Sequence, residues 1–178
     1  MIRIEHLTKK FGRFTAVDDL NLHVRPGEVF GFLGPNGAGK TTTMRIMVGL
    51  MRATSGRVLI GGHDVEHEPL HAKQVTGYIP DRPFLYEKLS GREFLRFTAG
   101  LYGMKPAEAE GRASELLGLF ELNRWANELV ESYSHGMKQR LTMGAALLHR
   151  PALVIVDEPM VGLDPRGAVL VKRIFRNM

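Results

Sequence analysis

The stretch Gly34-Pro35-Asn36-Gly37-Ala38-Gly39-Lys40-Thr41 fits the pattern G-x-x-x-x-G-K-[ST], in which a loop wraps a polyphosphate with its backbone N–H groups. Glycines suit such a loop because they have no Cβ and adopt positive φ easily. Lys40 would supply a point charge for the β- and γ-phosphate oxygens, and the Thr41 hydroxyl would complete the shell of a magnesium ion. The alternative is a glycine-rich turn with a stray lysine.

The flanking sequence supports the phosphate-binding interpretation. Residues 28–33, Glu-Val-Phe-Gly-Phe-Leu, predict a buried strand ahead of the loop. Residues 41–50 predict a helix after it, and the positive end of that helix would face the phosphates. We therefore expect a nucleotide-phosphate site at residues 34–42, made of Gly34, Pro35, Asn36, Gly37, Ala38, Gly39, Lys40, Thr41 and Thr42.

Composition is typical of a soluble, globular, intracellular protein. The 178 residues are 44% hydrophobic, enough for one core or for one core with a small subdomain. The chain has no cysteine, which excludes disulfides and thiolate metal sites. Its net charge of +5 is spread along the chain without a basic arm, so we expect no nucleic-acid partner.

Short strands alternate with helices along the chain. Strands are expected at 2–7, 20–24, 57–60, 75–79 and 153–156. Ser90 and Glu93 have capping-box spacing, so a helix should begin there, and further helices should follow Pro106, Ser134 and about residue 166. The apolar side chains at helical spacing are expected in the core: Phe94, Leu95, Phe97, Leu101, Tyr102, Ala113, Leu116, Leu117 and Phe120.

This order predicts an α/β fold in which a helical subdomain interrupts a nucleotide-binding core. The core is expected at residues 1–84 and 150–178, and the helical subdomain at residues 85–149.

A second set of chemical groups follows the strand at 153–156, where Asp157 and Glu158 come at its carboxyl end. Ligands bind at this edge of an open α/β sheet. A nucleoside triphosphatase needs a carboxylate for magnesium and a group that orients the attacking water. Asp157 suits the metal, and Glu158 suits the water, either as general base or as an electrostatic positioner. A solvated carboxylate at a strand end is the alternative for Glu158.

Over essentially its whole length the chain resembles the nucleotide-binding subunits of ATP-binding-cassette (ABC) transporters. The segment that carries the resemblance matches a variant of the family's signature loop, consensus Leu-Ser-Gly-Gly-Gln, with its five residues at Tyr133, Ser134, His135, Gly136 and Met137. The resemblance implies a P-loop NTPase core with an antiparallel β subdomain and an inserted α-helical subdomain. It also implies that this segment binds the γ-phosphate held by a second subunit, so that two subunits enclose two nucleotides. A plain helix N-cap at Ser134 is the alternative.

Three further residues are assigned by the resemblance. Phe11 stands where the family stacks an aromatic ring on adenine, and Asp164 stands in the loop that crosses to the partner subunit. Asp81 occupies the position of a family glutamine that touches magnesium. Asp81 can reach the metal directly or through water, or it can be a solvated loop carboxylate.

The family fold continues with a strand that ends in a histidine, and the sequence stops at Met178 before such a strand. We therefore expect the final strand or strands of the fold to be missing. His135 and His149 are in the wrong context to replace that histidine. Marginal stability or dependence on a partner is expected to follow.

The function implied is an ATPase subunit, using ATP and Mg²⁺, that drives an ABC-2-type exporter. Its partners would be a second nucleotide-binding subunit, identical or different, and integral membrane permease subunits. It would then lie in the cytoplasm, peripheral to the inner face of the membrane. One alternative is a nucleotide-binding regulatory module with little or no turnover. The other is a soluble non-transport relative that acts on ribosomes or DNA.

Overall fold

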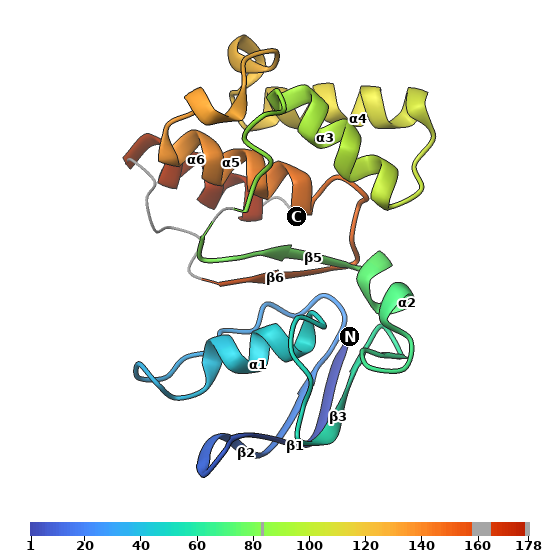
Figure 1. The fold of residues 1–178 in the computed structure, drawn as a ribbon, viewed down its shortest axis with the longest axis vertical. Coiled ribbons are helices and arrows are strands. Elements are labelled where there is room, and N and C mark those ends of the chain that lie inside the picture. Colours follow the sequence, from blue (N-terminus) through green and yellow to red (C-terminus); the bar gives the residue numbers. More distant parts are fainter. Residues whose placement is uncertain (83, 158–164, 177–178) are drawn as a thin grey trace. The chain divides into compact units, whose positions relative to one another are not determined.

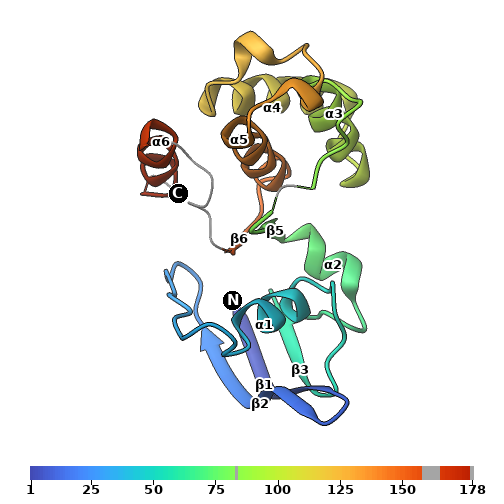
Figure 2. The same cartoon turned by 60° about the vertical axis from the view of Figure 1, so that its left-hand side comes forward.

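The computed structural model describes residues 1–82, 84–157 and 165–176. The chain forms two compact units, Met1–Tyr78 and Ile79–Met178. The predicted division into a core at 1–84 and 150–178 and a helical subdomain at 85–149 stays a prediction. Each unit is described by itself below (Figures 1 and 2).

The first unit is built on a four-stranded sheet with the order β2-β1-β3-β4, in which neighbouring strands are antiparallel. Its elements are β1 (Ile2–Phe11), β2 (Phe14–Val24), α1 (Lys40–Met47), β3 (Ser55–Ile60), β4 (His63–Asp64) and α2 (Pro69–Gln74). β1 lies inside the sheet because Ile2 pairs with Val24 on one side and with Ile60 on the other. The expected antiparallel β subdomain is confirmed.

One face of this sheet carries the core of the first unit. Alternate residues of β1 and β3 are buried, among them Ile2, Ile4, Val58 and Ile60, as the two-residue period of a strand requires. Helix α1 lies over the sheet (Figure 2) and buries apolar side chains, including Ile46 and Met47. The segment predicted to bind phosphate therefore leads into a helix that is anchored by its apolar side.

The prediction of a strand at residues 28–33 is wrong. None of the described strands pairs with this segment, and Val29 and Leu33 are 101% and 92% exposed. A buried strand needs neighbours for its backbone N–H and C=O groups. An apolar run shows only that a segment is suited to burial, and this segment has no such neighbour within the described sheets.

The second unit consists mainly of helices. Its elements are β5 (Thr76–Ile79, which begins in the first unit), α3 (Gly91–Leu101), α4 (Pro106–Leu119), η1 (Asn123–Trp125), η2 (Val130–Ser132), α5 (His135–Ala146), β6 (Leu153–Val156) and α6 (Pro165–Arg176). Strands β5 and β6 form a two-stranded sheet, and α3, α4 and α5 pack on one another (Figure 1).

The helix starts predicted at Ser90 and Pro106 are confirmed. Ser90 and Glu93 form a full capping box, in which each side chain receives a hydrogen bond from the other residue's backbone N–H. Pro106 is the first residue of α4, a position where its missing N–H costs nothing. Local side-chain chemistry thus defines both helix starts.

The predicted core of the second unit is only partly confirmed. Phe94, Leu95, Ala113, Leu116, Leu117 and Phe120 are buried as expected. Phe97 and Leu101, however, are 43% and 71% exposed, so the expectation was wrong for them. The buried side of α3 contains Gly91, Phe94, Leu95 and Ala99, and Phe97 instead meets the ring of Tyr86 edge-on, with centroids 5.1 Å apart.

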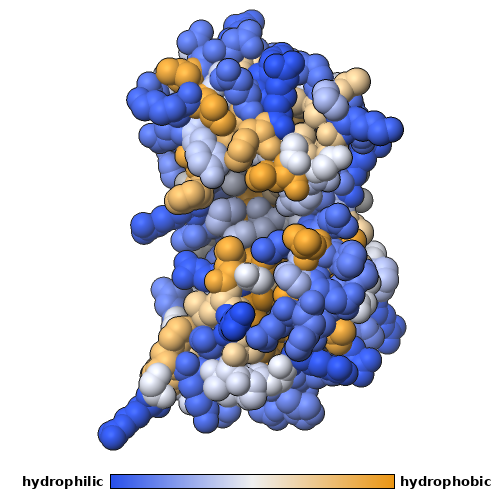
Figure 3. Space-filling view, turned by 45° about the vertical axis from the view of Figure 1, so that its right-hand side comes forward, coloured by the Kyte–Doolittle hydropathy of each residue, from blue (hydrophilic) through white to orange (hydrophobic). Residues whose placement is uncertain are grey.

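The face drawn in Figure 3 is covered mostly by hydrophilic residues, with hydrophobic ones in small groups. Within the described part of the chain, no helix combines the length and the apolar character that a membrane crossing requires.

Candidate functional site

The loop before α1 leaves the start of that helix open. Gly39 occupies the N-cap position with φ of +83°, and Gly37 also has a left-handed backbone with φ of +82°. No side chain caps the helix by a hydrogen bond. Because the first N–H groups of a helix have no partner within the helix, this end of α1 is suited to an anion.

A close contact with the backbone of β2 also requires glycine at position 39. A Cβ at Gly39 would lie 2.3 Å from the carbonyl oxygen of Ala16 and 3.1 Å from Cγ2 of Val17, both in β2. The loop is therefore packed on the sheet at the residue that precedes the helix. A larger residue there would have to displace either the loop or the strand.

The Lys40 side chain folds back over its own loop. Its Nζ donates hydrogen bonds to the carbonyl oxygens of Gly34 (2.7 Å) and Pro35 (2.8 Å). Residues 34–38 are exposed, so the ammonium group lies at a surface that a ligand can reach. The loop thus brings together a positive charge and an uncapped helix N-terminus.

The first turn of α1 contains the predicted hydroxyl groups. Thr41 and Thr42 are half-buried there, while Thr43 is buried and its hydroxyl donates to the carbonyl oxygen of Gly39 at 2.9 Å. Thr43 therefore holds the start of the helix together. Its neighbours Thr41 and Thr42 remain the candidates for contact with a ligand.

Phe11 lies at the end of β1 and does not belong to the core. It is 47% exposed, and Nζ of Lys9 lies 5.1 Å from the centre of its ring. An exposed aromatic face beside a cation is available for stacking with a base. The role in adenine binding stays a prediction.

In the second unit, Asp157 follows β6 and is only 4% exposed. Its backbone N–H donates to the carbonyl oxygen of Ile79 at 2.9 Å, which extends the pairing of β5 and β6 by one residue. Asp81 comes two residues after Ile79 and is half-buried. The structure therefore places both predicted magnesium ligands of this unit just beyond adjacent strands. Glu158 and Asp164 lie outside the described residues.

The predicted signature segment, residues 133–137, leads into α5. Ser134 is the N-cap, and its Oγ accepts a hydrogen bond from the Met137 N–H at 3.3 Å. Ser134 and His135 are exposed, whereas Gly136 and Met137 are half-buried. The cap is present, and the hydroxyl can still donate its own hydrogen to a ligand.

The buried side chain of Tyr133 anchors this segment. Tyr133 is 4% exposed, and its hydroxyl donates to the carbonyl oxygen of Trp125 at 2.6 Å. Burial raises the pKa of the Tyr133 hydroxyl, and the charge of Glu128 adds to the effect. The same hydroxyl would lie 2.3 Å from a Cβ at Gly91. Sequence spacing carries no signal for this long-range packing.

A surface ion pair lies one turn further along α5. Nζ of Lys138 contacts Oε1 of Glu87 at 2.5 Å, and this hydrogen bond lowers the pKa of Glu87. The pair links α5 to the segment that precedes α3. The signature segment is therefore held by contacts on both sides of its helix start.

Comparison with known proteins identifies the class. The family model described as ABC transporter matches residues 17–161, and the chain belongs to that family. The range includes both the loop before α1 and the segment before α5.

Individual relatives show the same likeness. The chain is 42% identical to the linearmycin resistance ATP-binding protein LnrL of Bacillus subtilis over 94% of its length and 54% of the relative's. It is 39% identical to the bacitracin transport ATP-binding protein BcrA of Bacillus licheniformis over 100% of its length and 57% of the relative's. The chain thus spans about half the length of these proteins.

Among solved structures, the chain resembles a dimeric ATP-binding cassette in a post-hydrolysis state bound to ADP and Pi. The TM-score is 0.89 at 25% identity, over 99% of this chain and 82% of the other. The α/β cassette fold is therefore confirmed.

Proposed function

We propose that this chain binds and hydrolyses ATP as the nucleotide-binding subunit of an ABC transporter of the ABC-2 export type. The observation that carries the proposal is the exposed loop at residues 34–38, which leads to Lys40 at the uncapped start of α1. Family membership supports the same conclusion.

Binding would begin with an exchange of partners at Lys40. Its Nζ leaves the carbonyl oxygens of Gly34 and Pro35 and turns to the β- and γ-phosphate oxygens. A charged acceptor gives a stronger hydrogen bond than a carbonyl does. The backbone N–H groups of residues 37–41 would bind the remaining phosphate oxygens, and Phe11 would stack on the adenine.

Magnesium fits the groups that the chain offers. Mg²⁺ prefers oxygen ligands, and the Thr41 hydroxyl and the Asp157 and Asp81 carboxylates would be its ligands from this chain. When bound with the nucleotide, the ion neutralises charge on the phosphates during phosphoryl transfer. Glu158 would orient the attacking water or accept its proton. Lys40 and Glu158 are the proposed catalytic residues.

The segment at residues 133–137 would bind the nucleotide of a second subunit. Its support is the exposed Ser134 hydroxyl at the N-terminus of α5. The similar cassette of known structure is a dimer bound to ADP and Pi, in keeping with such an arrangement. Asp164 would contribute to the same dimer contact.

The names of the relatives support the proposed transporter role and location. Their names describe linearmycin resistance and bacitracin transport, which favours export of drug-like compounds. We therefore propose that the subunit binds integral membrane permeases and lies at the cytoplasmic face of the membrane.

The decisive measurement is steady-state phosphate release with MgATP, compared with Glu158→Gln. We expect the variant to bind ATP like the wild type and to release phosphate much more slowly. Equal rates in the two proteins would overturn the hydrolysis proposal. Retained ATP binding with that result would favour a regulatory nucleotide-binding module, for which an aspartate at position 81 is the supporting observation.

A further inference from the structure

The connection after β3 contains an unusual group of histidines and carboxylates. Three of the chain's seven histidines lie between residues 63 and 71, at positions 63, 67 and 71. Their spacing of four would place all three on one side of a helix, but the structure divides them. His63 lies in β4, His71 lies in α2, and His67 turns toward Asp64 instead, with Nδ1 3.2 Å from Oδ1.

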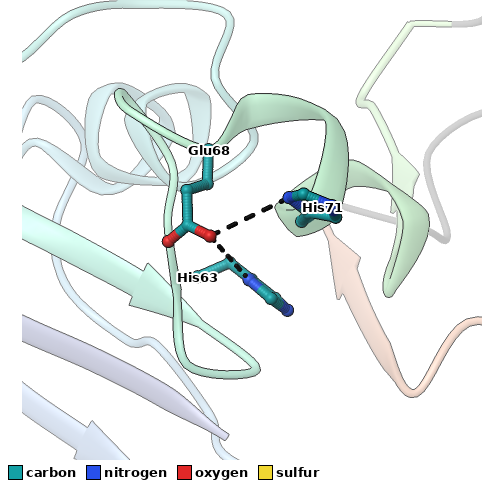
Figure 4. Close-up of side chains that lie close together, drawn as sticks. All are labelled: His63, Glu68 and His71. Carbon is teal, nitrogen blue, oxygen red and sulfur yellow. Dashed lines mark hydrogen bonds and ion pairs between the residues drawn. The ribbon is translucent and has the colours of Figure 1, made fainter.

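His63 and His71 converge on one carboxylate oxygen (Figure 4). Nδ1 of His63 lies 3.2 Å from Oε1 of Glu68, and Nδ1 of His71 lies 3.8 Å from the same oxygen. The two imidazole rings stack with centroids 5.1 Å apart and an angle of 27°. One ligand atom from each of the three residues lies within 4.8 Å of the other two. Among the described residues this is the only such group of three.

These separations suit a shared metal ion. Nitrogen and oxygen ligands of Zn²⁺ stand about 2.0–2.2 Å from the metal, so two ligand atoms in a tetrahedral shell are about 3.4 Å apart. The separations of Glu68 Oε1 from His63 Nδ1 and from His71 Nδ1 lie on either side of that value. The third separation, between ligand atoms of the two histidines, is at most 4.8 Å, so side-chain rotations would have to bring these two rings closer around a shared ion.

The backbone holds the carboxylate in place. The Asp64 N–H donates to Oε2 of Glu68 at 3.3 Å, which leaves Oε1 toward the two histidines. The Glu68 N–H donates back to the Asp64 carbonyl oxygen at 2.7 Å. Buried Val65 and Ala72 anchor the turn and α2. Groups that orient a ligand in this way are typical of metal sites.

We propose that His63, Glu68 and His71 form a binding site for a divalent first-row transition-metal ion, with Zn²⁺ as the best fit. Two imidazole nitrogens and one carboxylate oxygen suit Zn²⁺, whereas Mg²⁺ and Ca²⁺ prefer oxygen ligands alone. The His63, Glu68 and His71 side chains are 37%, 46% and 63% exposed, so a fourth position is open to water. The site uses none of the residues proposed for ATP or for its magnesium.

The test is a calorimetric titration of the untagged full chain with ZnCl₂, without nucleotide. We expect one ion to bind per chain. Changing a residue that only orients a ligand typically weakens metal binding about 10–100-fold, so His63→Ala, Glu68→Gln and His71→Ala should each weaken it by about 100-fold or more. His67→Ala is the matched control and should bind Zn²⁺ like the wild type.

Thermal unfolding with and without ZnCl₂ separates loss of the site from loss of the fold. Without metal, all four variants should melt close to the wild type, because the side chains they change are partly exposed. Zn²⁺ should raise Tm in the wild type and in His67→Ala but not in the other three. The proposal is overturned if the wild type binds no stoichiometric Zn²⁺, or if His67→Ala loses as much affinity as His63→Ala.

Discussion

Helices α1 and α5 both begin at an exposed loop, but the two loops are built differently. The loop before α1 uses left-handed glycines and leaves the helix without a side-chain cap. The loop before α5 uses the Ser134 side chain as a cap and is held by a buried tyrosine. The first helix start is therefore free for an anion, whereas an anion at the second must share Ser134 with the helix.

The largest effect is expected where the first loop touches β2. Gly39→Ala adds a Cβ 2.3 Å from the Ala16 carbonyl oxygen and places alanine at positive φ. Overpacking and backbone strain together should lower the free energy of unfolding by about 2–5 kcal/mol. Urea unfolding followed by circular dichroism measures this change.

Gly37→Ala is the control, because its backbone is equally left-handed but its Cβ would meet nothing within 4 Å. Gly37→Ala should lower the free energy of unfolding by only about 1–2 kcal/mol. Equal losses in the two variants would show that the contact with Ala16 has no effect on stability.

Lys40→Ala tests the ligand side of the first loop. Loss of a charge-assisted hydrogen bond to phosphate, about 1.5–3 kcal/mol, should weaken ATP binding about 10- to 100-fold. The free energy of unfolding should change little, because the two hydrogen bonds of Lys40 lie at an exposed surface. Equilibrium binding of a fluorescent ATP analogue measures the affinity, with exposed Lys105→Ala as the control. Unchanged affinity in Lys40→Ala would contradict a phosphate role for this loop.

Gly91→Ala tests the support of the second loop. The new Cβ would lie 2.3 Å from the Tyr133 hydroxyl, so stability should fall by about 1–3 kcal/mol. In the same helix, Gly100→Ala meets nothing within 4 Å and should stabilise by about 0.5–1 kcal/mol through helix propensity. Thermal unfolding gives the sign of each effect.

Tyr133→Phe in the Gly91→Ala background removes the colliding oxygen, so the double variant should lose less than the sum of the two single changes. Additive losses would mean that the two residues do not interact.

The smallest effect separates the two roles of Ser134. Ser134→Ala should cost about 1 kcal/mol because the cap is lost, whereas Ser134→Gly should cost only a few tenths. Both variants lack the hydroxyl. If the hydroxyl binds a nucleotide, phosphate release should fall equally in both, whatever their stability. If phosphate release instead falls more in Ser134→Ala than in Ser134→Gly, in line with their stabilities, Ser134 acts only as a helix cap.

Local patterns in the sequence carry much of this structure. Strand β6 has the predicted bounds because a continuous apolar run lies between Pro151 and Asp157. The helix starts at Ser90, Pro106 and Ser134 were predicted because caps act within three or four residues. The motif at residues 34–41 was identified for the same reason, because its glycines and its lysine are close together in the sequence.

Features that depend on distant partners were not predicted. The apolar run at 28–33 indicates burial but does not specify which strand would pair with it, and the structure forms no strand there. Helical spacing placed Phe97 and Leu101 in the core, although the described neighbours of α3 leave both exposed. The contact of Tyr133 with Gly91 joins residues more than forty positions apart.

By itself, the sequence determined the glycine-rich loop before α1, the capped helix starts and the family, because each depends on residues that are adjacent in the chain or on their order. Only the tertiary structure decided that Gly39 must be glycine against β2 and that Tyr133 holds the segment before α5. It also selected His63 and His71, and not His67, to face Glu68. The physical reason is that side-chain direction and close packing depend on how separate elements meet, which local spacing does not specify.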